Sequence, residues 1–235
     1  MKITIIQTGE VPEPLAPRFG SYPRMFERMF DATGGDFSYE VVAASGGEAL
    51  PDPGGLDGIV ITGSPAGVYE DHPWLDPLRD FIRRAYAANT PMLGICFGHQ
   101  IMADATGGVV TKSDKGWGIG RHTYRVMARP SFMADAPEAV SVACSHQDQV
   151  IVPPANAEVI LASEFTPNAG LVYRNGAALS FQPHPEFEDD YAQALAEMRR
   201  GLAPDAVVDG AVASLERPSD SRAVSGYIAR FFTER

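Results

Sequence analysis

Short apolar segments alternate with amphipathic segments through the first hundred residues of the chain. Ranges rich in β-branched residues, at 3–7, 39–43 and 58–62, are separated by the helix-like ranges 22–30 and 75–87. Such alternation is typical of βαβ units, whose strands run parallel in one sheet with helices packed on its faces. We therefore predict an α/β fold with a central sheet, mixed but mostly parallel, that is flanked by helices.

The pattern changes in the second half of the chain, where strand-like ranges are joined by short loops. These ranges are 120–127, 140–145, 158–162 and 170–181. Their close spacing favours antiparallel pairing. Within the last of them, Asn175 and Gly176 form a pair suited to the two positive φ angles of a type I′ hairpin turn. Helical patterns follow near residues 190–200 and 222–232.

Length and composition are those of one soluble domain. At 235 residues, 45% of them hydrophobic and 21% charged, the chain can bury one sizeable core, and we predict a single domain over residues 1–235. The formal net charge of −11 disfavours nucleic acid and anionic membrane as partners, because both attract clustered Lys and Arg. A small-molecule substrate fits this charge better.

Two cysteines, Cys96 and Cys144, provide neither a disulfide framework nor the CxxC spacing of a zinc site. This usage favours a reducing compartment and no bound metal. The apolar run at the N-terminus is too short for a signal peptide, and no stretch approaches the roughly 18 apolar residues of a membrane span. We therefore expect a cytoplasmic protein.

Cys96 stands in a motif with the form of a nucleophile elbow, a sharp strand-to-helix turn that exposes a reactive side chain. The motif is the range 94–98, Gly-Ile-Cys-Phe-Gly, between a strand-like range at 91–95 and a helix-compatible one at 100–105. Such a helix would direct its free N–H groups and the positive end of its dipole toward the sulfur, which favours a thiolate. The pattern alone is equally compatible with a buried structural cysteine.

His184 is the candidate base for this nucleophile. Pro183 and Pro185 flank it directly after an apolar strand, and Glu186 follows two residues later. Proline fixes φ, so the imidazole has little freedom. Residues two apart in an extended chain project to the same side, so Glu186 can accept a hydrogen bond from one ring nitrogen. The alternative is a rigid surface turn.

Together the two motifs resemble the class I glutamine amidotransferases over roughly residues 1 to 190. The range 94–100 matches the nucleophile motif of that family, and the range 182–186 matches its His-x-Glu motif. The resemblance implies a three-layer, flavodoxin-like α/β domain with the triad Cys96, His184 and Glu186, and no cofactor. A helical segment, about 190–235, would follow this motif-bearing core.

In that family the oxyanion hole is built from two backbone N–H groups. One belongs to the residue after the cysteine, here Phe97, and the other to a glycine-rich turn, here Ser64, whose neighbour Gly63 is expected to contact substrate. The family often has Gly-Gly-Pro at this turn, so Ser64 is a departure from the pattern. A serine can serve if its backbone angles allow, because the donor is a main-chain group.

Further positions match residues that contact substrate in the family. Gln100 corresponds to a side chain that commonly contacts glutamine. Ser145, His146 and Gln147 begin a segment that resembles the Ser-His-x-Asp-x-Val segment of the GMP synthetase amidotransferase branch, where main-chain groups bind the amino-acid end of glutamine. Gln147 replaces the usual glycine there. The loop at 115–120 resembles a glycine-rich loop of the same branch, although a plain connecting loop is the preferred interpretation of that range, and the range 68–74 could form a rim over the site.

The resemblance implies hydrolysis of the γ-amide of glutamine through a cysteinyl thioester, with release of glutamate and of ammonia for an unknown acceptor. A separate synthetase or acceptor subunit would then be the partner. The alternative is a stand-alone γ-glutamyl peptidase, similar to those of plants, that acts on γ-glutamyl compounds. A third reading is a catalytically silent binding or regulatory module, which the intact set of Cys96, His184 and Glu186 disfavours.

Overall fold

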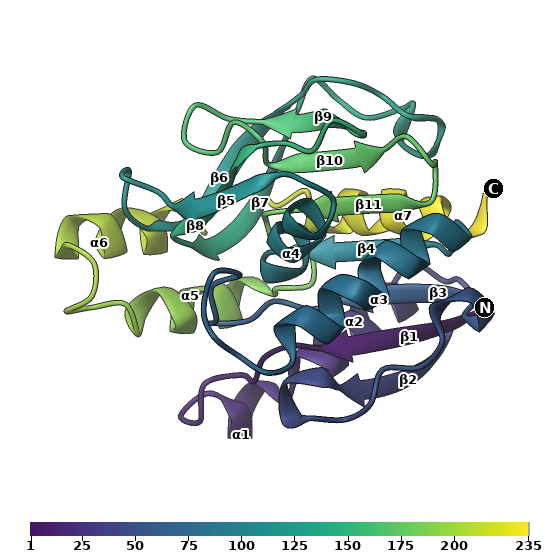
Figure 1. Ribbon diagram of the computed structural model, residues 1–235. Coiled ribbons are helices and arrows are strands. Elements are labelled where there is room, and N and C mark those ends of the chain that lie inside the picture. The colour runs from purple at the N-terminus through teal and green to yellow at the C-terminus, as the bar shows by residue number, and fades with distance from the viewer. Residues whose placement is uncertain (235) are drawn as a thin grey trace.

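One nine-stranded sheet runs through the middle of the molecule in the computed structural model, which describes residues 1–234 (Figure 1). In spatial order its strands are β2 (Ser38–Ala43), β1 (Lys2–Gln7), β3 (Gly58–Ile61), β4 (Met92–Ile95), β11 (Ala178–Phe181), β10 (Gly170–Tyr173), β9 (Ala157–Ala162), β6 (Gly118–Val126) and β7 (Ala139–His146). The strands from β2 to β11 pair in parallel. Beyond β11 the pairing is antiparallel. The predicted mixed α/β sheet is confirmed.

Helices cover both faces of the parallel half and produce three layers (Figure 1). The helices are α1 (Ala16–Phe19), α2 (Tyr22–Asp31), α3 (Leu75–Ala88), α4 (Phe97–Ala105), α5 (Asp189–Glu197), α6 (Asp205–Ser214) and α7 (Ser221–Thr233). The helices and strands expected in the first hundred residues agree with the structure to within one residue at each end. No helix in the described part of the chain is long and apolar enough to cross a membrane.

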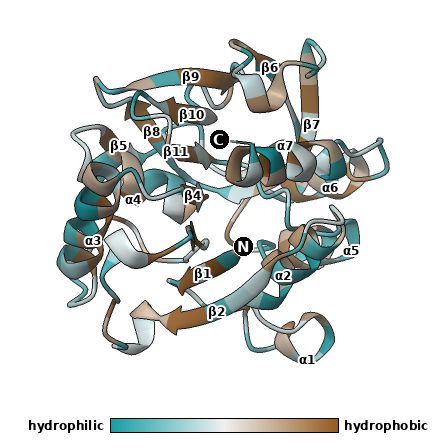
Figure 2. Cartoon of the chain, turned by 90° about the vertical axis from the view of Figure 1, so that its right-hand side faces the viewer, coloured by the Kyte–Doolittle hydropathy of each residue, from teal (hydrophilic) through white to brown (hydrophobic). Residues whose placement is uncertain are grey.

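The alternation of side chains along the strands divides the core between the two faces. Ile3 and Ile5 of β1 pack with α2 and α7 in one buried cluster, whereas Ile6 packs with α3 and α4 in another. Because both faces are covered, the parallel strands are hydrophobic on both sides, as expected for a parallel sheet. Helix α3 carries both hydrophilic and hydrophobic residues, in keeping with one buried face (Figure 2).

The hairpin between β10 and β11 differs from the turn expected from its sequence. Gly176 has a φ of 68°, but Asn175 is not among the residues with positive φ, so the turn is not type I′. Instead the side chain of Asn175 accepts a hydrogen bond from the N–H of Ala177 at 3.0 Å. This side-chain bond supports the turn locally, which leaves only the glycine in the left-handed region. Two further strands, β5 (Val109–Lys112) and β8 (Asp148–Val152), form a separate antiparallel pair.

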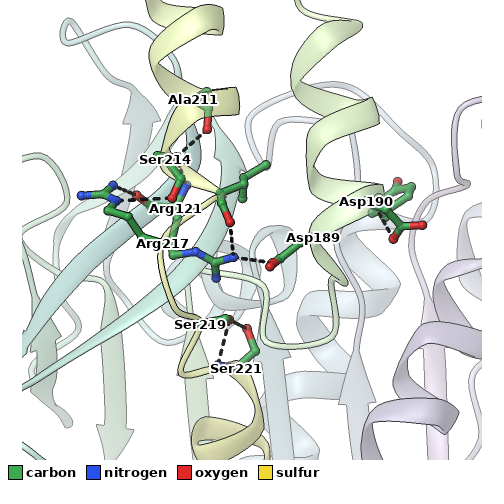
Figure 3. Close-up of polar contacts among 10 residues, drawn as sticks. Arg121, Asp189, Asp190, Ala211, Ser214, Arg217, Ser219 and Ser221 are labelled. Atoms are coloured by element: carbon green, nitrogen blue, oxygen red, sulfur yellow. Dashed lines mark hydrogen bonds and ion pairs between the residues drawn. The ribbon is translucent and has the colours of Figure 1, made fainter.

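The C-terminal segment is held against β6 by a buried arginine (Figure 3). Arg121 of β6 has only 1% of its side chain exposed and forms an ion pair with Asp189 at the start of α5. Its guanidinium also donates to Leu215 O at 3.3 Å, and its backbone N–H donates to Ser214 Oγ at 2.7 Å. Helix α6, which the sequence patterns did not predict, therefore packs directly on the antiparallel half of the sheet.

Candidate active site

The loops at the carboxyl ends of β1, β3, β4 and β11 meet at one edge of the sheet (Figure 1). Ligands of open parallel sheets bind at this edge, because strand ends and helix N-termini leave a crevice there. The residues that follow these strands are Thr8 after β1, Gly63 after β3, Cys96 after β4 and His184 after β11. The tertiary structure thus brings both predicted motifs to the same place.

Cys96 lies between β4 and α4 in a backbone conformation that non-glycine residues rarely adopt. Its φ is 55° and its ψ is −104°, outside the low-energy regions for an L-residue. Its backbone N–H donates to Phe181 O of the adjacent strand at 2.8 Å. Strain of this kind persists only where the surrounding structure imposes it, and it is concentrated at functional sites. The sharp strand-to-helix turn expected from the sequence is present, with Cys96 at its apex.

Gly94 and Gly98 let three backbone segments come close around this turn. A Cβ on Gly94 would lie 2.5 Å from the carbonyl carbon of Gly98, and a Cβ on Gly98 would overlap the carbonyl oxygen of Ile61 in β3. Neither glycine has a positive φ. Close packing, rather than an unusual backbone angle, therefore requires both glycines.

His184 and Glu186 form a buried hydrogen-bonded pair. His184 Nδ1 and Glu186 Oε1 are 2.6 Å apart, and 5% and 1% of the two side chains are exposed. The backbone N–H of His184 donates to Ala143 O at 2.8 Å, and the ring of Phe187 stacks on the imidazole with centroids 3.9 Å apart. These contacts fix both the position and the plane of the ring.

Two neighbouring negative charges control the protonation of His184. Burial by itself lowers the pKa of this imidazole, but the charges of Glu186 and Cys96, with the hydrogen bond to Glu186, raise the pKa from 6.5 to about 10. At neutral pH the ring is therefore an imidazolium cation between a carboxylate and the sulfur. A cation in that position stabilises negative charge on the sulfur.

The other two histidines near the site behave differently. Burial lowers the pKa of His99 to about 3, and its Nδ1 lies 2.8 Å from Ser180 Oγ. Burial, together with repulsion from His122 and His184, also lowers the pKa of His146 to about 3. Both rings are neutral at physiological pH, so of these three imidazoles only His184 is a cation there.

Gly63 stands against both members of the Cys–His pair. A Cβ on Gly63 would lie 3.2 Å from His184 Cε1 and 3.7 Å from Cys96 Cβ. Gly9, after β1, supports the same turn from behind, because its own Cβ would lie 2.8 Å from Ser64 Cα. The turn after β3 is therefore packed between the end of β1 and the two candidate catalytic residues.

The backbone N–H groups of Ser64 and Phe97 form no hydrogen bond to any group within residues 1–234. By contrast, the N–H of Gly98 donates to Thr62 O at 3.2 Å and the N–H of Gln100 donates to Cys96 O at 3.0 Å. Ser64 has no positive φ, so a serine is accommodated there without strain. Its Oγ accepts from Ala66 N at 3.2 Å, within its own loop.

A pocket of about 150 Å³ opens next to Cys96. Its lining residues come from the loop after β3, from α4, from the β5–β6 region, from the β7–β8 turn and from the end of α5. They are Ser64, Pro65, Ala66, Gly67, Tyr69, Glu70, Cys96, Gln100, Lys112, Trp117, Ser145, His146, Gln147, Asp148 and Arg199. Of the five residues expected to contact substrate, Gln100, Ser145, His146 and Gln147 line this pocket, whereas Gly63 is not among its lining residues.

Gln100 is held in place by the opposite side of the pocket. Its Nε2 donates to Asp148 O at 2.8 Å and to Gln182 Oε1 at 3.1 Å. Because both amide protons are used, the group that Gln100 can offer a ligand is its carbonyl oxygen. Two pocket atoms from the β7–β8 segment, Ser145 Oγ and His146 Nε2, are buried without a hydrogen-bond partner in the described residues.

The family model for "Glutamine amidotransferase class-I" matches residues 21–194. This match covers most of the chain. The chain belongs to the class I glutamine amidotransferase family. The resemblance seen in the two motifs is thereby confirmed at the level of the family.

Relatives of this class I glutamine amidotransferase include two kinds of enzyme. γ-Glutamyl peptidase 4 of Arabidopsis thaliana is 31% identical over 178 residues, which are 73% of this chain and 70% of that protein. A glutamine-hydrolysing GMP synthase of Aquifex aeolicus is 36% identical over 129 residues. That match includes 55% of this chain and 24% of the synthase, so the chain spans about a quarter of the synthase.

Among solved structures, a glutamine amidotransferase from Thermotoga maritima superposes with a TM-score of 0.76. The superposition covers 100% of this chain and 97% of that chain at 23% sequence identity. At that identity the comparison concerns the fold, and it agrees with the mixed sheet and flanking helices described above.

Several pocket residues of this amidotransferase were not expected from sequence motifs. Arg199 follows α5 and lies about a hundred positions from Cys96 along the chain, whereas Asp148 is the aspartate of the Ser-His-x-Asp-x-Val segment but was given no role of its own. The range 68–74 was expected to form a rim, and its Tyr69 does line the pocket, where its hydroxyl donates to Asp148 Oδ1 at 3.1 Å. The loop at 115–120 contributes Trp117. Only proximity in space identifies Arg199, because no spacing rule connects it to the nucleophile.

Proposed function

We propose that the chain is a cysteine hydrolase that cleaves the γ-amide bond of glutamine or of a related γ-glutamyl compound. The observation that supports this proposal most directly is the arrangement around Cys96. The sulfur of Cys96 lies at a strained turn beside the imidazolium of His184. The Nδ1 atom of that ring is 2.6 Å from Oε1 of the buried Glu186. A nucleophile, a proton donor and an orienting acid in this order are the elements of triad catalysis.

In the first half of the reaction, the thiolate of Cys96 attacks the γ-carbonyl carbon of the donor. The new C–S bond places a negative charge on the carbonyl oxygen, toward which the free N–H groups of Ser64 and Phe97 would donate. The C–N bond then breaks, and His184 gives its proton to the leaving nitrogen. A γ-glutamyl thioester remains on Cys96.

In the second half, the neutral His184 takes a proton from a water molecule whose oxygen attacks the thioester. The C–S bond breaks, glutamate leaves, and the thiolate and the imidazolium are restored. Glu186 keeps its hydrogen bond to Nδ1 throughout, so the same ring nitrogen faces the sulfur in both halves. Cys96 and Ser64 line the pocket, whereas His184 and Glu186 form the buried pair beside Cys96.

The identity of the leaving nitrogen separates two versions of this function. With glutamine as donor, ammonia leaves and would pass to an unknown acceptor, with a separate synthetase subunit as partner. With a γ-glutamyl compound as donor, an amine or amino acid leaves and no acceptor is needed. The similarity to a γ-glutamyl peptidase over 73% of the chain supports the second version, and the similarity to GMP synthase supports the first.

A donor panel tests the proposal. Purified protein is incubated with glutamine and with γ-glutamyl dipeptides, and release of glutamate, ammonia and amino acid is measured. Cys96→Ala should abolish release from every donor. Cys144→Ala is the matched control, because Cys144 is also buried and burial raises the pKa of its thiol to about 12.

Labelling with a glutamine-like electrophile provides a readout that needs no turnover. We expect one adduct, on Cys96, in the native protein and in Cys144→Ala. Absence of turnover with every donor, together with absence of an adduct on Cys96, would overturn the proposal in favour of a silent binding module. Undiminished turnover by His184→Ala would remove His184 from the mechanism.

A further inference from the structure

One end of the pocket at Cys96 presents both signs of charge. Lys112, Glu70 and Asp148 all line it, and their charges influence one another. Asp148 O also accepts the hydrogen bond from Gln100 Nε2, so this end lies beside Gln100. An ammonium and a carboxylate on one ligand, as in the amino-acid end of a γ-glutamyl group, would both find a partner there.

Arg199 lines the same pocket but stands apart from those carboxylates. Among residues 1–234 its guanidinium forms no ion pair with either Glu70 or Asp148. Its guanidinium stacks on a tryptophan, with Cζ 4.3 Å from the centroid of the Trp117 ring. The turn that carries it is well anchored, because its backbone carbonyl accepts from two N–H groups at 2.8 and 2.9 Å.

A chain of aromatic contacts connects His184 to α5, the helix that Arg199 follows. The ring of Phe187 stacks on His184 with centroids 3.9 Å apart. Tyr191 packs edge-on against Phe187 at 4.6 Å, and its hydroxyl donates to the hydroxyl of Tyr22 at 3.2 Å. Arg199 follows α5, the helix that carries Tyr191, and lines the pocket together with Cys96, so its guanidinium is available to a group that leaves from the His184 side of the sulfur.

Arg199 also differs from the other arginines of the chain. Within residues 1–234, four arginine side chains form no hydrogen bond or ion pair, and three of them, Arg125, Arg174 and Arg222, are exposed to water. Arg199 alone of the four is partly buried, and its Nε is fully buried without a partner. A guanidinium withdrawn from water without a counter-charge is unfavourable, and a bound carboxylate would relieve that cost.

We infer that Arg199 determines donor specificity by pairing with a carboxylate on the leaving group. This inference rests on the proposed function and names its substrate class. Glutamine has one carboxylate and one ammonium, which the charged groups beside Gln100 can match. A γ-glutamyl amino acid or peptide has a second carboxylate, on the side that leaves, and Arg199 is the cation available to it.

The reaction is then the hydrolysis of a γ-glutamyl amino acid to glutamate and the free amino acid. The sulfur of Cys96 forms a bond to the γ-carbonyl carbon, the C–N bond breaks, and the α-amino nitrogen of the leaving amino acid takes the proton of His184. Water then cleaves the thioester. The carboxylate held by Arg199 stays ionised throughout, so its role is to position the leaving amino acid.

The test compares donors that differ only in that carboxylate. We use γ-glutamylglycine, the same dipeptide with a C-terminal amide, and glutamine. The native protein should prefer free γ-glutamylglycine over its amide by about 10- to 100-fold in kcat/KM, mainly through KM, as a charge-assisted pair predicts. In Arg199→Gln this preference should fall to about twofold or less, because kcat/KM for the free acid falls much further than kcat/KM for the amide and for glutamine.

Two further variants separate charge from structure. Arg174→Gln removes an exposed, unpaired arginine of the β10–β11 hairpin and should keep the native preference. Arg199→Lys retains the charge without the planar fork and should restore part of the preference. Thermal unfolding of all variants, together with the rate on the amide, shows whether the pocket is intact.

Three outcomes would overturn the inference while the proposed function stands. The first is a native protein that does not discriminate between the acid and the amide, and the second is an unchanged preference in Arg199→Gln. The third is an equal loss of kcat/KM on all donors in Arg199→Gln, which would place Arg199 at the shared γ-glutamyl end. Failure of the proposed function has a different signature. It would appear as no turnover of any donor and no labelling of Cys96 in the native protein.

Discussion

Replacing Glu186 by glutamine tests the central electrostatic feature of the site. At about 1.4 kcal/mol for each pH unit, the rise of the His184 pKa from 6.5 to about 10 corresponds to roughly 5 kcal/mol of stabilisation of the imidazolium. The charge of Glu186 is the largest favourable contribution to that rise. In Glu186→Gln we expect the alkaline limb of the kcat/KM profile to move from near pH 10 toward neutrality by about two pH units or more.

The same substitution should lower activity at neutral pH. Without the carboxylate, less of the imidazole is protonated and the ring orientation is no longer fixed by a 2.6 Å hydrogen bond to an acid. We expect kcat/KM to fall about 10²- to 10⁴-fold at pH 7, the range typical of a lost acid–base contribution. The assay is glutamate release between pH 6 and 10.5, with Glu188→Gln as control, because Glu188 lies two residues further on and is exposed.

Stability offers a second measurement with a defined sign. His184 binds its proton more tightly in the folded than in the unfolded chain, so its contribution is fully present below about pH 6.5 and is lost as the pH rises through about 10. The difference in unfolding free energy between native protein and Glu186→Gln should therefore shrink over that interval. An alkaline limb at the same pH in both proteins would refute the assignment of Glu186 as the group that holds the imidazolium.

Three other substitutions follow from the packing around the site. Gly98→Ala would overlap a backbone carbonyl of β3 and should cost about 1–3 kcal/mol of stability; an unchanged urea midpoint contradicts this. In Gly63→Ala the new Cβ would lie 3.2 Å from His184 Cε1. We expect kcat to fall about tenfold or more with little change in melting temperature, and full activity would contradict this prediction. Asp189→Asn leaves Arg121, 1% exposed, without its anionic partner and should cost about 2 kcal/mol, because Asp189 is itself half exposed. Denaturant titration at two salt concentrations measures that loss, and a stability equal to the native value would show that Asp189 contributes nothing.

The local sequence pattern was sufficient for the first four parallel strands, but it placed β11, which pairs in parallel with β4, in the antiparallel half. Strands such as β1 and β3 and helices such as α2 and α3 are each specified by the spacing of apolar residues within about ten positions. The pattern was insufficient for α6, which carries Gly210 near its middle and leaves most of its residues exposed. That helix exists because Val208 and Ala211 pack in a buried cluster with β6 and α5, a contact that no local spacing records.

The turn at Asn175 and Gly176 illustrates the same limit on a smaller scale. The dipeptide is compatible with more than one turn, and the chosen turn depends on how β10 and β11 pair and on a hydrogen bond from the asparagine side chain. The free-energy difference between turn types is small compared with the free energy lost when two buried strands pair in the wrong register. The register therefore decided the turn.

What the sequence determined by itself about this amidotransferase is its family, its parallel sheet and the candidate triad of Cys96, His184 and Glu186. Each of these depends on residues that are close together in the chain: the glycines around Cys96, and the prolines and glutamate around His184. What only the tertiary structure decided is the charge distribution of the pocket. Arg199 reaches the site only after α5 has packed beside His184, and its lack of a counter-charge is visible only when every neighbouring side chain is in place.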